Sequence, residues 1–260
     1  MTESDEQFRS VLDHRYSTLR YLADSPASKP KLVDGLETSR STVDRAINDL
    51  VEIGCVTSEN GEYRPTTAGH LAMREHRRYR ETTHAVSETT DFINHLPPDT
   101  GLDTSLLEQA TVTMSKEHAP EQALTPTIDI FERATHMRGL APVVLNFYPN
   151  LISNQLAESD LTVEIIAETD VVTTLPDIPN TGDVSLSDAE GLSLYETDSD
   201  LPYALWLMET PTETYAGITV YDSGGPAGVL INDTDAAVQW TETQYEQFRE
   251  SAQLTSASEL

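Results

Sequence analysis

The dipeptide Asn60-Gly61 separates two short extended runs, about residues 55–58 and 62–65. Asn-Gly between such runs is a strong hairpin signal, because both residues tolerate the positive φ angles of a tight two-residue turn. Three segments precede the hairpin in which apolar residues recur three or four positions apart, as one buried helix face requires. These segments cover about residues 5–23, 28–36 and 40–53. A fourth helical segment begins after Thr66, so the order predicts a small domain of three helices, a hairpin and a closing helix.

The third helical segment has an apolar stripe and a polar face. The first two helices are expected to hold it by the stripe, which leaves the polar face free to enter the major groove of DNA. The stripe consists of Val43, Ile47, Leu50 and Val51. The polar face carries Arg40, Ser41, Asp44, Arg45 and Asn48. Gly54 ends the helix, and the following hairpin serves as a wing, which is the layout of a winged helix-turn-helix domain.

Geometry assigns a role to the polar residues of this domain. Free N–H groups and the helix dipole favour phosphate at the start of the third helix. Arg45 and Asn48 lie one turn further, where a side chain reaches base edges. Asp44 is read either as an acceptor from a cytosine amino group or as a solvated acid favoured by the dipole. The predicted DNA-contacting residues are Lys29, Ser39, Arg40, Ser41, Thr42, Arg45, Asn48, Asn60, Tyr63 and Arg64.

Residues 32–69 read LVDGLETSRSTVDRAINDLVEIGCVTSENGEYRPTTAG. This string resembles winged-helix regulators of archaea and bacteria, and the resemblance implies double-stranded promoter or operator DNA as the partner. The alternative is a winged helix that contacts only proteins, as an adaptor of the transcription machinery.

The charge of the chain is divided unevenly. The 260 residues carry 16 Lys and Arg against 44 Asp and Glu, a net charge of −28. Residues 1–80 hold a net charge of −1, and residues 81–260 hold −27. Only three of the cations are Lys, and such acid-rich, Lys-poor compositions are typical of proteins from salt-accumulating halophiles. The alternative is an acidic protein that docks on a basic partner.

The cellular compartment and the absence of a cofactor are predicted from sequence features that the chain lacks. A single cysteine, Cys55, allows neither an intrachain disulfide nor a cysteine-based metal site. The acidic start MTESDEQF has no signal-peptide core, and no apolar run approaches the length of a membrane-spanning helix. We therefore expect a cytoplasmic protein with no cofactor, no metal and no membrane partner.

A long helix over about residues 67–95 is predicted to connect two domains, and Pro97-Pro98 stops it. Apolar residues at seven-residue spacing suggest a helix–helix dimer seam, and packing on the chain's own domains is the alternative. These residues are Ala72, Tyr79, Val86, Ile93 and Leu96. A basic run begins at Arg74, and it either approaches phosphate or tethers the acidic domain. It comprises Arg74, His76, Arg77, Arg78 and Arg80.

Beyond residue 100, strand-like and helix-like segments alternate, which favours an α/β sheet domain. Strands are expected at about 110–115, 161–168, 203–208, 215–221 and 227–231. Helices are expected at about 120–137, 148–157 and 169–175 and from 235 onward. Trp206, Trp240 and Tyr245 are read as core residues. The predicted organisation is a DNA-binding domain at 1–80, a linking helix at 81–99, an effector domain at 100–253 and a tail at 254–260.

Three strings in this region carry a second resemblance: MRGLAPVVLNFYPNL, LPYALWLMET and YAGITVYDSGGPAGVLINDTDAAVQWTETQYEQFRES. They resemble haloarchaeal one-component regulators whose C-terminal domain is named for a methanogenesis regulatory protein. The chain is also distantly similar to sugar-sensing regulators whose effector domain has a phospholipase-D-like fold. The resemblance implies an α+β protein with a winged helix, a linking helix and a C-terminal α/β effector domain.

Catalysis is not expected in the effector domain. Phospholipase-D enzymes use a His-x-Lys motif with a nucleophilic His, and this chain has the order Lys116-Glu117-His118 instead. Ligands of α/β sheets bind at the carboxyl ends of strands, so polar residues placed there are candidates for binding a small effector. They are Lys116, His118, Arg138, Asn146, Tyr148, Asn232 and Asp233.

Within this set, Arg138 is expected at a helix end, and it suggests an anionic metabolite such as a sugar phosphate. An ion pair with Glu132 or Asp129 is the alternative, and Asn232 to Thr234 are alternatively a helix cap. The sequence as a whole predicts a homodimeric, sequence-specific transcriptional regulator. The non-DNA-binding adaptor is the rival, and an enzyme ranks third.

Overall fold

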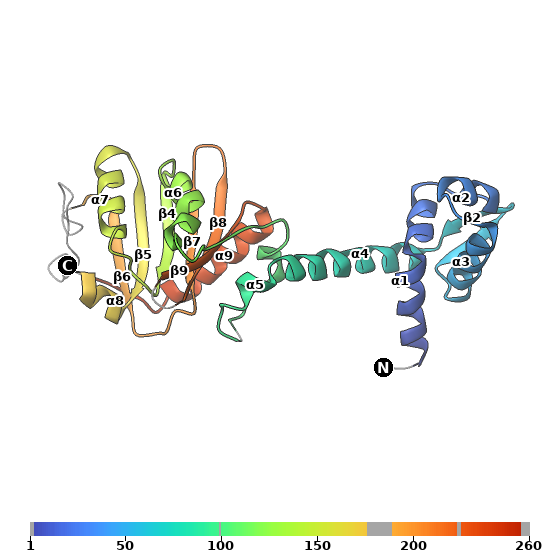
Figure 1. Cartoon of the computed structure of the whole chain (residues 1–260), viewed down its shortest axis with the longest axis horizontal. Coiled ribbons are helices and arrows are strands. Elements are labelled where there is room, and N and C mark those ends of the chain that lie inside the picture. The colour runs from blue at the N-terminus through green and yellow to red at the C-terminus, as the bar shows by residue number, and fades with distance from the viewer. Residues whose placement is uncertain (1–2, 99, 176–188, 223–224, 256–260) are drawn as a thin grey trace. The chain divides into compact units, whose positions relative to one another are not determined.

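The structure is a computed structural model that describes residues 3–98, 100–175, 189–222 and 225–255 (Figure 1). Its contacts divide the chain into two compact units, Met1–Thr83 and His84–Leu260. The boundary lies within helix α4 (Thr67–Glu88), and each unit has a hydrophobic core of its own. No helix in the described ranges is long and apolar enough to span a bilayer.

The first unit has the predicted order of elements. It contains α1 (Glu3–Asp24), α2 (Lys29–Gly35), α3 (Arg40–Glu52), β1 (Val56–Glu59), β2 (Glu62–Pro65) and the first part of α4. Its core joins all three helices to the wing through Leu12, Leu19, Leu22, Leu32, Val43, Ile47, Leu50, Cys55 and Val56. One stripe prediction is wrong: Val51 is 45% exposed, and Ala46 is buried beside Val43 instead. Val51 lies one step around the helix from Leu50, outside the arc that faces α1.

The wing forms as the Asn-Gly signal predicts. Asn60 and Gly61 have φ angles of 54° and 83°, as a type I′ turn requires, and Glu59 pairs with Glu62 across it. Tyr63 of β2 also exchanges two backbone hydrogen bonds with Ala27, which lies between α1 and α2. The hairpin is therefore anchored to the helical part of the unit by main-chain bonds.

The linking segment is not one continuous helix. The prediction of a single helix over 67–95 is wrong, because α4 ends at Glu88 and a short α5 (Thr90–Ile93) follows. At the break, the Thr89 hydroxyl donates to the Ala85 carbonyl at 2.8 Å, and the Thr89 backbone leaves the helical region with ψ near 6°. A Thr hydroxyl that donates to the carbonyl four residues earlier often bends a helix.

The residues of the predicted seam are shared between the two units. Ala72 packs on the core of the first unit. Val86, Ile93 and Leu96 pack on the core of the second. Tyr79 is 64% exposed, so it is the member of the set that presents a large apolar surface to solvent.

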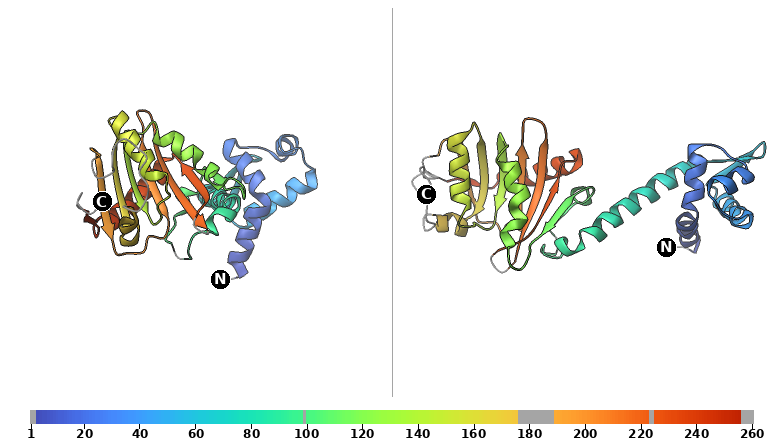
Figure 2. Two further views of the ribbon diagram at one scale, coloured as in Figure 1. Left: turned by 60° about the vertical axis from the view of Figure 1, so that its left-hand side comes forward. Right: turned by 45° about the horizontal axis from the view of Figure 1, so that its top comes forward.

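The second unit is built on one mixed sheet of eight strands in the order β10-β6-β5-β4-β7-β8-β9-β3 (Figures 1 and 2). The strands β4, β5 and β6 run parallel, and the remaining neighbours pair antiparallel. Their bounds are β3 (Thr111–Met114), β4 (His136–Ala141), β5 (Thr162–Glu168), β6 (Leu192–Thr197), β7 (Ala204–Glu209), β8 (Thr214–Asp222), β9 (Gly225–Asn232) and β10 (Gln253–Leu254).

Helices cover both faces of this sheet (Figure 2). One face packs against α9, α5 and η1, and the other packs against α6 and α7. The bounds are η1 (Thr104–Leu106), η2 (Pro120–Leu124), α6 (Thr125–Phe131), α7 (Tyr148–Glu158), α8 (Thr169–Thr174) and α9 (Asp235–Arg249). The fold is thus α+β, as predicted, with a three-layered α/β second unit.

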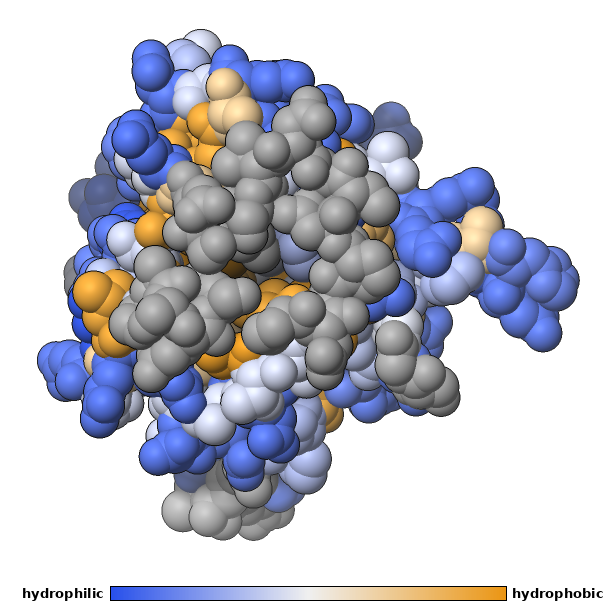
Figure 3. Space-filling model, turned by 90° about the vertical axis from the view of Figure 1, so that its left-hand side faces the viewer, coloured by the Kyte–Doolittle hydropathy of each residue, from blue (hydrophilic) through white to orange (hydrophobic). Residues whose placement is uncertain are grey.

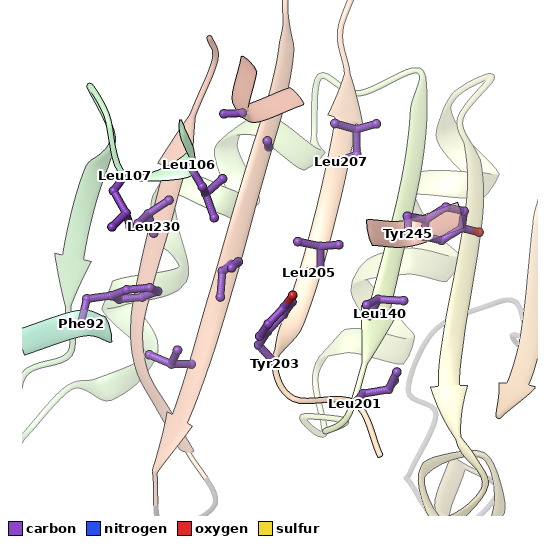
Figure 4. Packing of buried hydrophobic residues seen from close by; sticks show 14 of the residues in the cluster. Phe92, Leu106, Leu107, Leu140, Leu201, Tyr203, Leu205, Leu207, Leu230 and Tyr245 are labelled. Carbon is purple, nitrogen blue, oxygen red and sulfur yellow. The ribbon is translucent and has the colours of Figure 1, made fainter. Parts of the chain in front are cut away.

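Side chains alternate between the two faces along each central strand, as the pleat requires. On β7, Leu205 and Leu207 point to the α9 face, together with Tyr203 just before the strand (Figure 4). Trp206 and Met208 belong to the opposite cluster, under α6 and α7. Trp206 and Tyr245 are buried core residues, as predicted, and Trp240 is half-buried.

One expected helix of the second unit is wrong, and two of its strands were not predicted. The segment 120–137 is not one helix, because a 3₁₀ turn and α6 end at Phe131 and residues 136–141 form the central strand β4. The strands β6 and β10 were not predicted at all. Part of the predicted tail, residues 256–260, lies outside the described residues.

Candidate nucleic-acid interface and effector site

Helix α3 presents a continuous polar face to solvent. Ser41, Asp44, Arg45 and Asn48 recur at three- and four-residue spacing and are exposed, as is Arg40 at the first position of the helix. The opposite side of the helix is buried through Val43, Ala46, Ile47 and Leu50. The core therefore fixes the orientation of the helix and leaves the polar face available to a partner.

The start of α3 is held by its own cap. The Ser39 hydroxyl accepts from the Thr42 amide at 3.2 Å and lies 3.0 Å and 2.9 Å from the hydroxyls of Ser41 and Thr42. Arg45 lies back along the helix, and its Nε donates to the Ser41 carbonyl at 3.2 Å. These contacts order the first turn of the helix, where unpaired N–H groups favour phosphate.

Lys29 links three elements of this surface. Its ammonium lies 2.7 Å from the Asp44 carboxylate of α3 and 5.9 Å from the centre of the Tyr63 ring on the wing. The hydrogen bond to Asp44 raises the pKa of Lys29, so the ammonium stays charged at neutral pH. Asp44 is therefore ion-paired with Lys29 in the free protein while it remains exposed to solvent.

The predicted wing residues have different roles. Asn60 lies exposed at the tip, and Arg64 is exposed and paired with Glu59 on the neighbouring strand. Tyr63 is half-buried and packs on the core, so most of its ring supports the wing. Asn60 and Arg64 are consequently the wing side chains best placed to reach a phosphate backbone.

The basic run of α4 is exposed except for one member. Arg74, Arg77, Arg78 and Arg80 are exposed. The His76 ring instead packs 5.0 Å from the ring of Tyr16 on α1, with its Nε2 3.6 Å from an Asp13 oxygen. His76 therefore belongs to the contact between α1 and α4.

The candidate effector residues do not meet at one place. Arg138 lies within β4, not at a helix end as predicted, and it points to the α9 face. It forms ion pairs with Glu209, Glu242 and Glu246 at 3.6, 3.0 and 3.4 Å, and not with Glu132 or Asp129. Three carboxylates thus already surround the guanidinium, and they repel a further anion.

Asn232 is buried and fully engaged in structure. Its side-chain amide donates to the carbonyls of Leu106 and Glu108 at 2.9 and 2.8 Å, and its oxygen accepts from the Thr234 amide at 2.8 Å. Thr234 then caps α9 by accepting from Ala237. The alternative reading of this segment as a helix cap is correct, and Asp233 is exposed beside it.

The other candidates are dispersed. Lys116 and His118 are exposed just after β3, beside the start of β9. Asn232 lies at the other end of β9. Asn146 is exposed before α7. Tyr148, at the start of α7, borders a cavity of about 100 Å³ on the sheet face away from Arg138.

Sequence reasoning missed this cavity. Its floor includes Trp206, which was read as a simple core residue, and the strand glycine Gly139. A glycine inside a strand often marks a close approach, but the sequence did not reveal residues 136–141 as a strand, so Gly139 gave no such signal. In the described ranges, no cluster of His, Cys, Asp or Glu is arranged to hold a metal ion.

Comparisons with known proteins agree with the resemblance of the C-terminal strings. The family described as methanogenesis regulatory protein FilR1, middle domain, matches residues 120–251, just over half of the chain. The chain therefore belongs to this family of regulatory proteins. A second family, described as the HVO_A0261 N-terminal domain, matches residues 3–88. No curated protein sequence matches the chain significantly.

Among solved structures, the chain is similar to TrmBL2, an archaeal chromatin protein described as showing a novel mode of DNA binding. The two are 12% identical with a TM-score of 0.42, over 97% of this chain and 100% of the other. NucT from Helicobacter pylori is 12% identical with a TM-score of 0.40, over 56% and 99%. The phospholipase D family member Nuc from Salmonella typhimurium is 14% identical with a TM-score of 0.39, over 57% and 98%.

Proposed function

We infer that the chain is a sequence-specific DNA-binding transcriptional regulator. The observation that carries this inference is the exposed polar face of α3, which the core of the first unit holds beside an anchored wing. Arg45 and Asn48 would read base edges in the major groove, and Arg40 and Arg64 would contact phosphate. The membership of the second unit in a family of regulatory proteins supports the same function.

A homodimer and a sensed effector complete the proposal. Tyr79, a member of the seven-residue apolar repeat, is exposed on α4, and α4 would contact a second copy through it. A dimer would place two recognition helices about one helical turn of DNA apart. The second unit would bind a small molecule and thereby favour one dimer geometry, which requires different affinities for the two states.

The acidic composition is part of the proposal. The excess of Asp and Glu and the scarcity of Lys fit a cytoplasm at molar salt, such as that of a halophilic archaeon. At such salt the Debye length is about 3 Å, so the net charge of −28 would repel DNA only weakly. Binding would then rest on close hydrogen bonds, shape and dimer symmetry.

A double substitution tests DNA recognition. Arg40→Ala with Arg45→Ala removes two exposed cations of α3 without touching the core. We expect binding to the chain's own promoter DNA to weaken at least about ten-fold, because each lost arginine contact contributes on the order of 1–3 kcal/mol. Fluorescence anisotropy measures the affinity, and circular dichroism checks that the variant remains folded.

Arg133→Ala is the matched control, because it removes one exposed arginine from the second unit. It should leave the affinity for promoter DNA unchanged. If the loss of binding free energy per removed arginine were equal in the two variants, net charge alone would explain the effect. No loss in the α3 variant would favour the adaptor function instead.

A further inference from the structure

The sheet face under α6 and α7 holds an apolar cavity of about 100 Å³. Strands β4, β5, β7 and β8 form its floor, and the two helices form its walls. Among the described residues that line it there is no charged side chain. Arg138, which is paired with carboxylates of α9, lies on the opposite face of the sheet, because side chains alternate along β4.

Trp206 lies in the floor between two glycines. It pairs in register with Gly139 on β4 and with Gly217 on β8. A Cβ on Gly217 would lie only 2.1 Å from Cζ2 of the indole, so the ring lies directly on the backbone of β8. The absence of a side chain at Gly139 keeps the floor open on the other side of Trp206. Gly217 thus allows the indole ring to lie flat on β8, and Gly139 leaves the cavity open beside the ring.

Two residues that line this cavity each have a buried polar atom without a hydrogen-bond partner among the described residues. The two atoms are the indole Nε1 of Trp206, a residue that is only 4% exposed, and the hydroxyl oxygen of Thr127 on α6. A buried N–H without an acceptor is unfavourable by about 1–3 kcal/mol, and native structures rarely retain one. An acceptor supplied by a bound molecule would remove that penalty.

The remaining polar groups of the cavity are neutral. The hydroxyls of Tyr148 and Tyr221 lie 3.5 Å apart at its edge. Burial raises the pKa of both phenols, so both stay protonated at physiological pH. With no cation in the described lining, an anion would lose its hydration without gaining a partner.

A second apolar cavity, of about 70 Å³, adjoins the first. The two share the wall residues Val143, Tyr148 and Ile152, and the second reaches α8 and β6. From the side on which β6 lies, hydrophobic side chains are visible at the surface among hydrophilic ones (Figure 3). The space continues from the first cavity in the direction of this edge of the sheet.

We propose that this cavity binds a small, neutral, mainly apolar molecule of about one aromatic ring, whose hydrogen-bond acceptor faces Nε1 of Trp206. The first cavity alone, at about 100 Å³, is smaller than the apolar cavities of about 150 Å³ that bind benzene, but together with the adjoining cavity of about 70 Å³ the space reaches that size. The neighbouring cavity would take a short alkyl substituent. The binding of such a molecule is proposed independently of the regulator function. Only its role as an effector rests on the function proposed above. The class differs from the anionic metabolite that Arg138 suggested.

The test uses three probes of nearly equal shape. Acetophenone carries a carbonyl acceptor, ethylbenzene carries none, and benzoate carries a negative charge. The chain has two tryptophans, so the full-length protein labelled with ¹⁵N-tryptophan gives two indole N–H signals. The signal that disappears in Trp206→Phe belongs to Trp206.

We expect acetophenone to bind and to move the Trp206 indole proton downfield, while the signal of Trp240 stays in place. Ethylbenzene should bind about five-fold more weakly, as the loss of one neutral hydrogen bond predicts, without the downfield shift. Benzoate should not bind. An unmoved Trp206 signal at saturating acetophenone, or benzoate binding as tight as acetophenone, would overturn the proposal.

Two variants sharpen the result. Thr127→Val keeps the shape of the side chain and removes its hydroxyl, and Val143→Phe fills the space that the two cavities share. Val143→Phe should abolish acetophenone binding, and Thr127→Val should leave ethylbenzene binding as it is. If either variant fails to fold, the comparison of the three probes on the unaltered chain still tests the proposal.

Promoter binding by the ligand-free chain is measured in parallel. Intact acetophenone binding without DNA binding would overturn the regulator function and leave the cavity proposal standing. DNA binding without binding of any probe would overturn the cavity proposal and leave the regulator function standing.

Discussion

Tyr203 shows how a single buried hydroxyl shapes stability. Its ring lies in the core on the α9 face, 3% exposed (Figure 4), and its hydroxyl has no hydrogen-bond partner among the described residues. Burial raises the pKa of this phenol to about 12. In the unfolded chain the same phenol titrates near 10. The stability contributed by the neutral form is therefore present below pH 10 and is lost between pH 10 and pH 12.

Tyr203→Phe should be neutral or slightly stabilising at pH 7, because it removes an unpartnered polar atom. At pH 11 the variant should have lost about 1.4 kcal/mol less of its free energy of unfolding than the native chain. Urea unfolding at pH 7 and at pH 11 measures both effects.

The exposed Tyr79 provides the control, since Tyr79→Phe should change neither value. A clear loss of stability in Tyr203→Phe at pH 7 would mean that the hydroxyl has a partner in solution.

Residue chemistry also explains why the predicted effector residues did not form one site. Polar side chains such as Arg138 and Asn232 can be recognised in the sequence, but their partners are far away along the chain. Arg138 is matched by Glu242 and Glu246 of α9, and Asn232 by backbone carbonyls of a segment more than a hundred residues earlier. Such long-range pairing has no local signature, so a structural role looks the same as a binding role.

At the scale of elements, the strands β7 and β8 pack through Trp206 and Gly217. A Cβ on Gly217 would overlap the indole ring, so Gly217→Ala should lower the free energy of unfolding by about 1–3 kcal/mol. Urea unfolding at high salt measures the loss, and the tryptophan emission should change with it.

Gly225→Ala is the matched substitution on β9, because a Cβ there meets nothing within 4 Å. It should stay within about 0.5 kcal/mol of the native chain. If both alanine variants were equally stable, the close packing of the indole on β8 would be refuted.

The first unit could be predicted element by element because its signals are local. An Asn-Gly turn, a Ser39 cap and apolar stripes are each contained in a few residues, and α3 and the wing appear where those signals place them. Residues 136–141 were misread because Arg138 and His136 make the strand look polar, although it is central in the sheet. Strand order and register are set by pairing across long separations, and so the cavity around Trp206 could not be derived beforehand.

At the scale of the whole molecule, the dominant property is a net charge of −28, most of it in residues 81–260. At 0.1 M salt the Debye length is about 10 Å, and like charges on one domain then repel one another. At molar salt the length falls to about 3 Å, which removes most of this repulsion.

We therefore expect the chain to unfold or lose cooperativity in dilute buffer and to regain a sharp thermal transition in 2–3 M KCl. Thermal melts followed by circular dichroism measure this. Sucrose of equal osmolality separates screening from solute exclusion, because it should restore little of the stability. A salt-independent melting temperature would contradict the halophilic reading of the composition.

The central claim is that the face of α3 reads DNA sequence. The most direct measurement is a selection of genomic DNA fragments by the full-length chain at high salt, followed by sequencing, with the Arg40→Ala, Arg45→Ala variant in parallel. The account predicts one enriched motif with two related half-sites about one helical turn apart, which the variant fails to enrich. Recovered DNA without an enriched motif, or the same motif enriched equally by the variant, would contradict it.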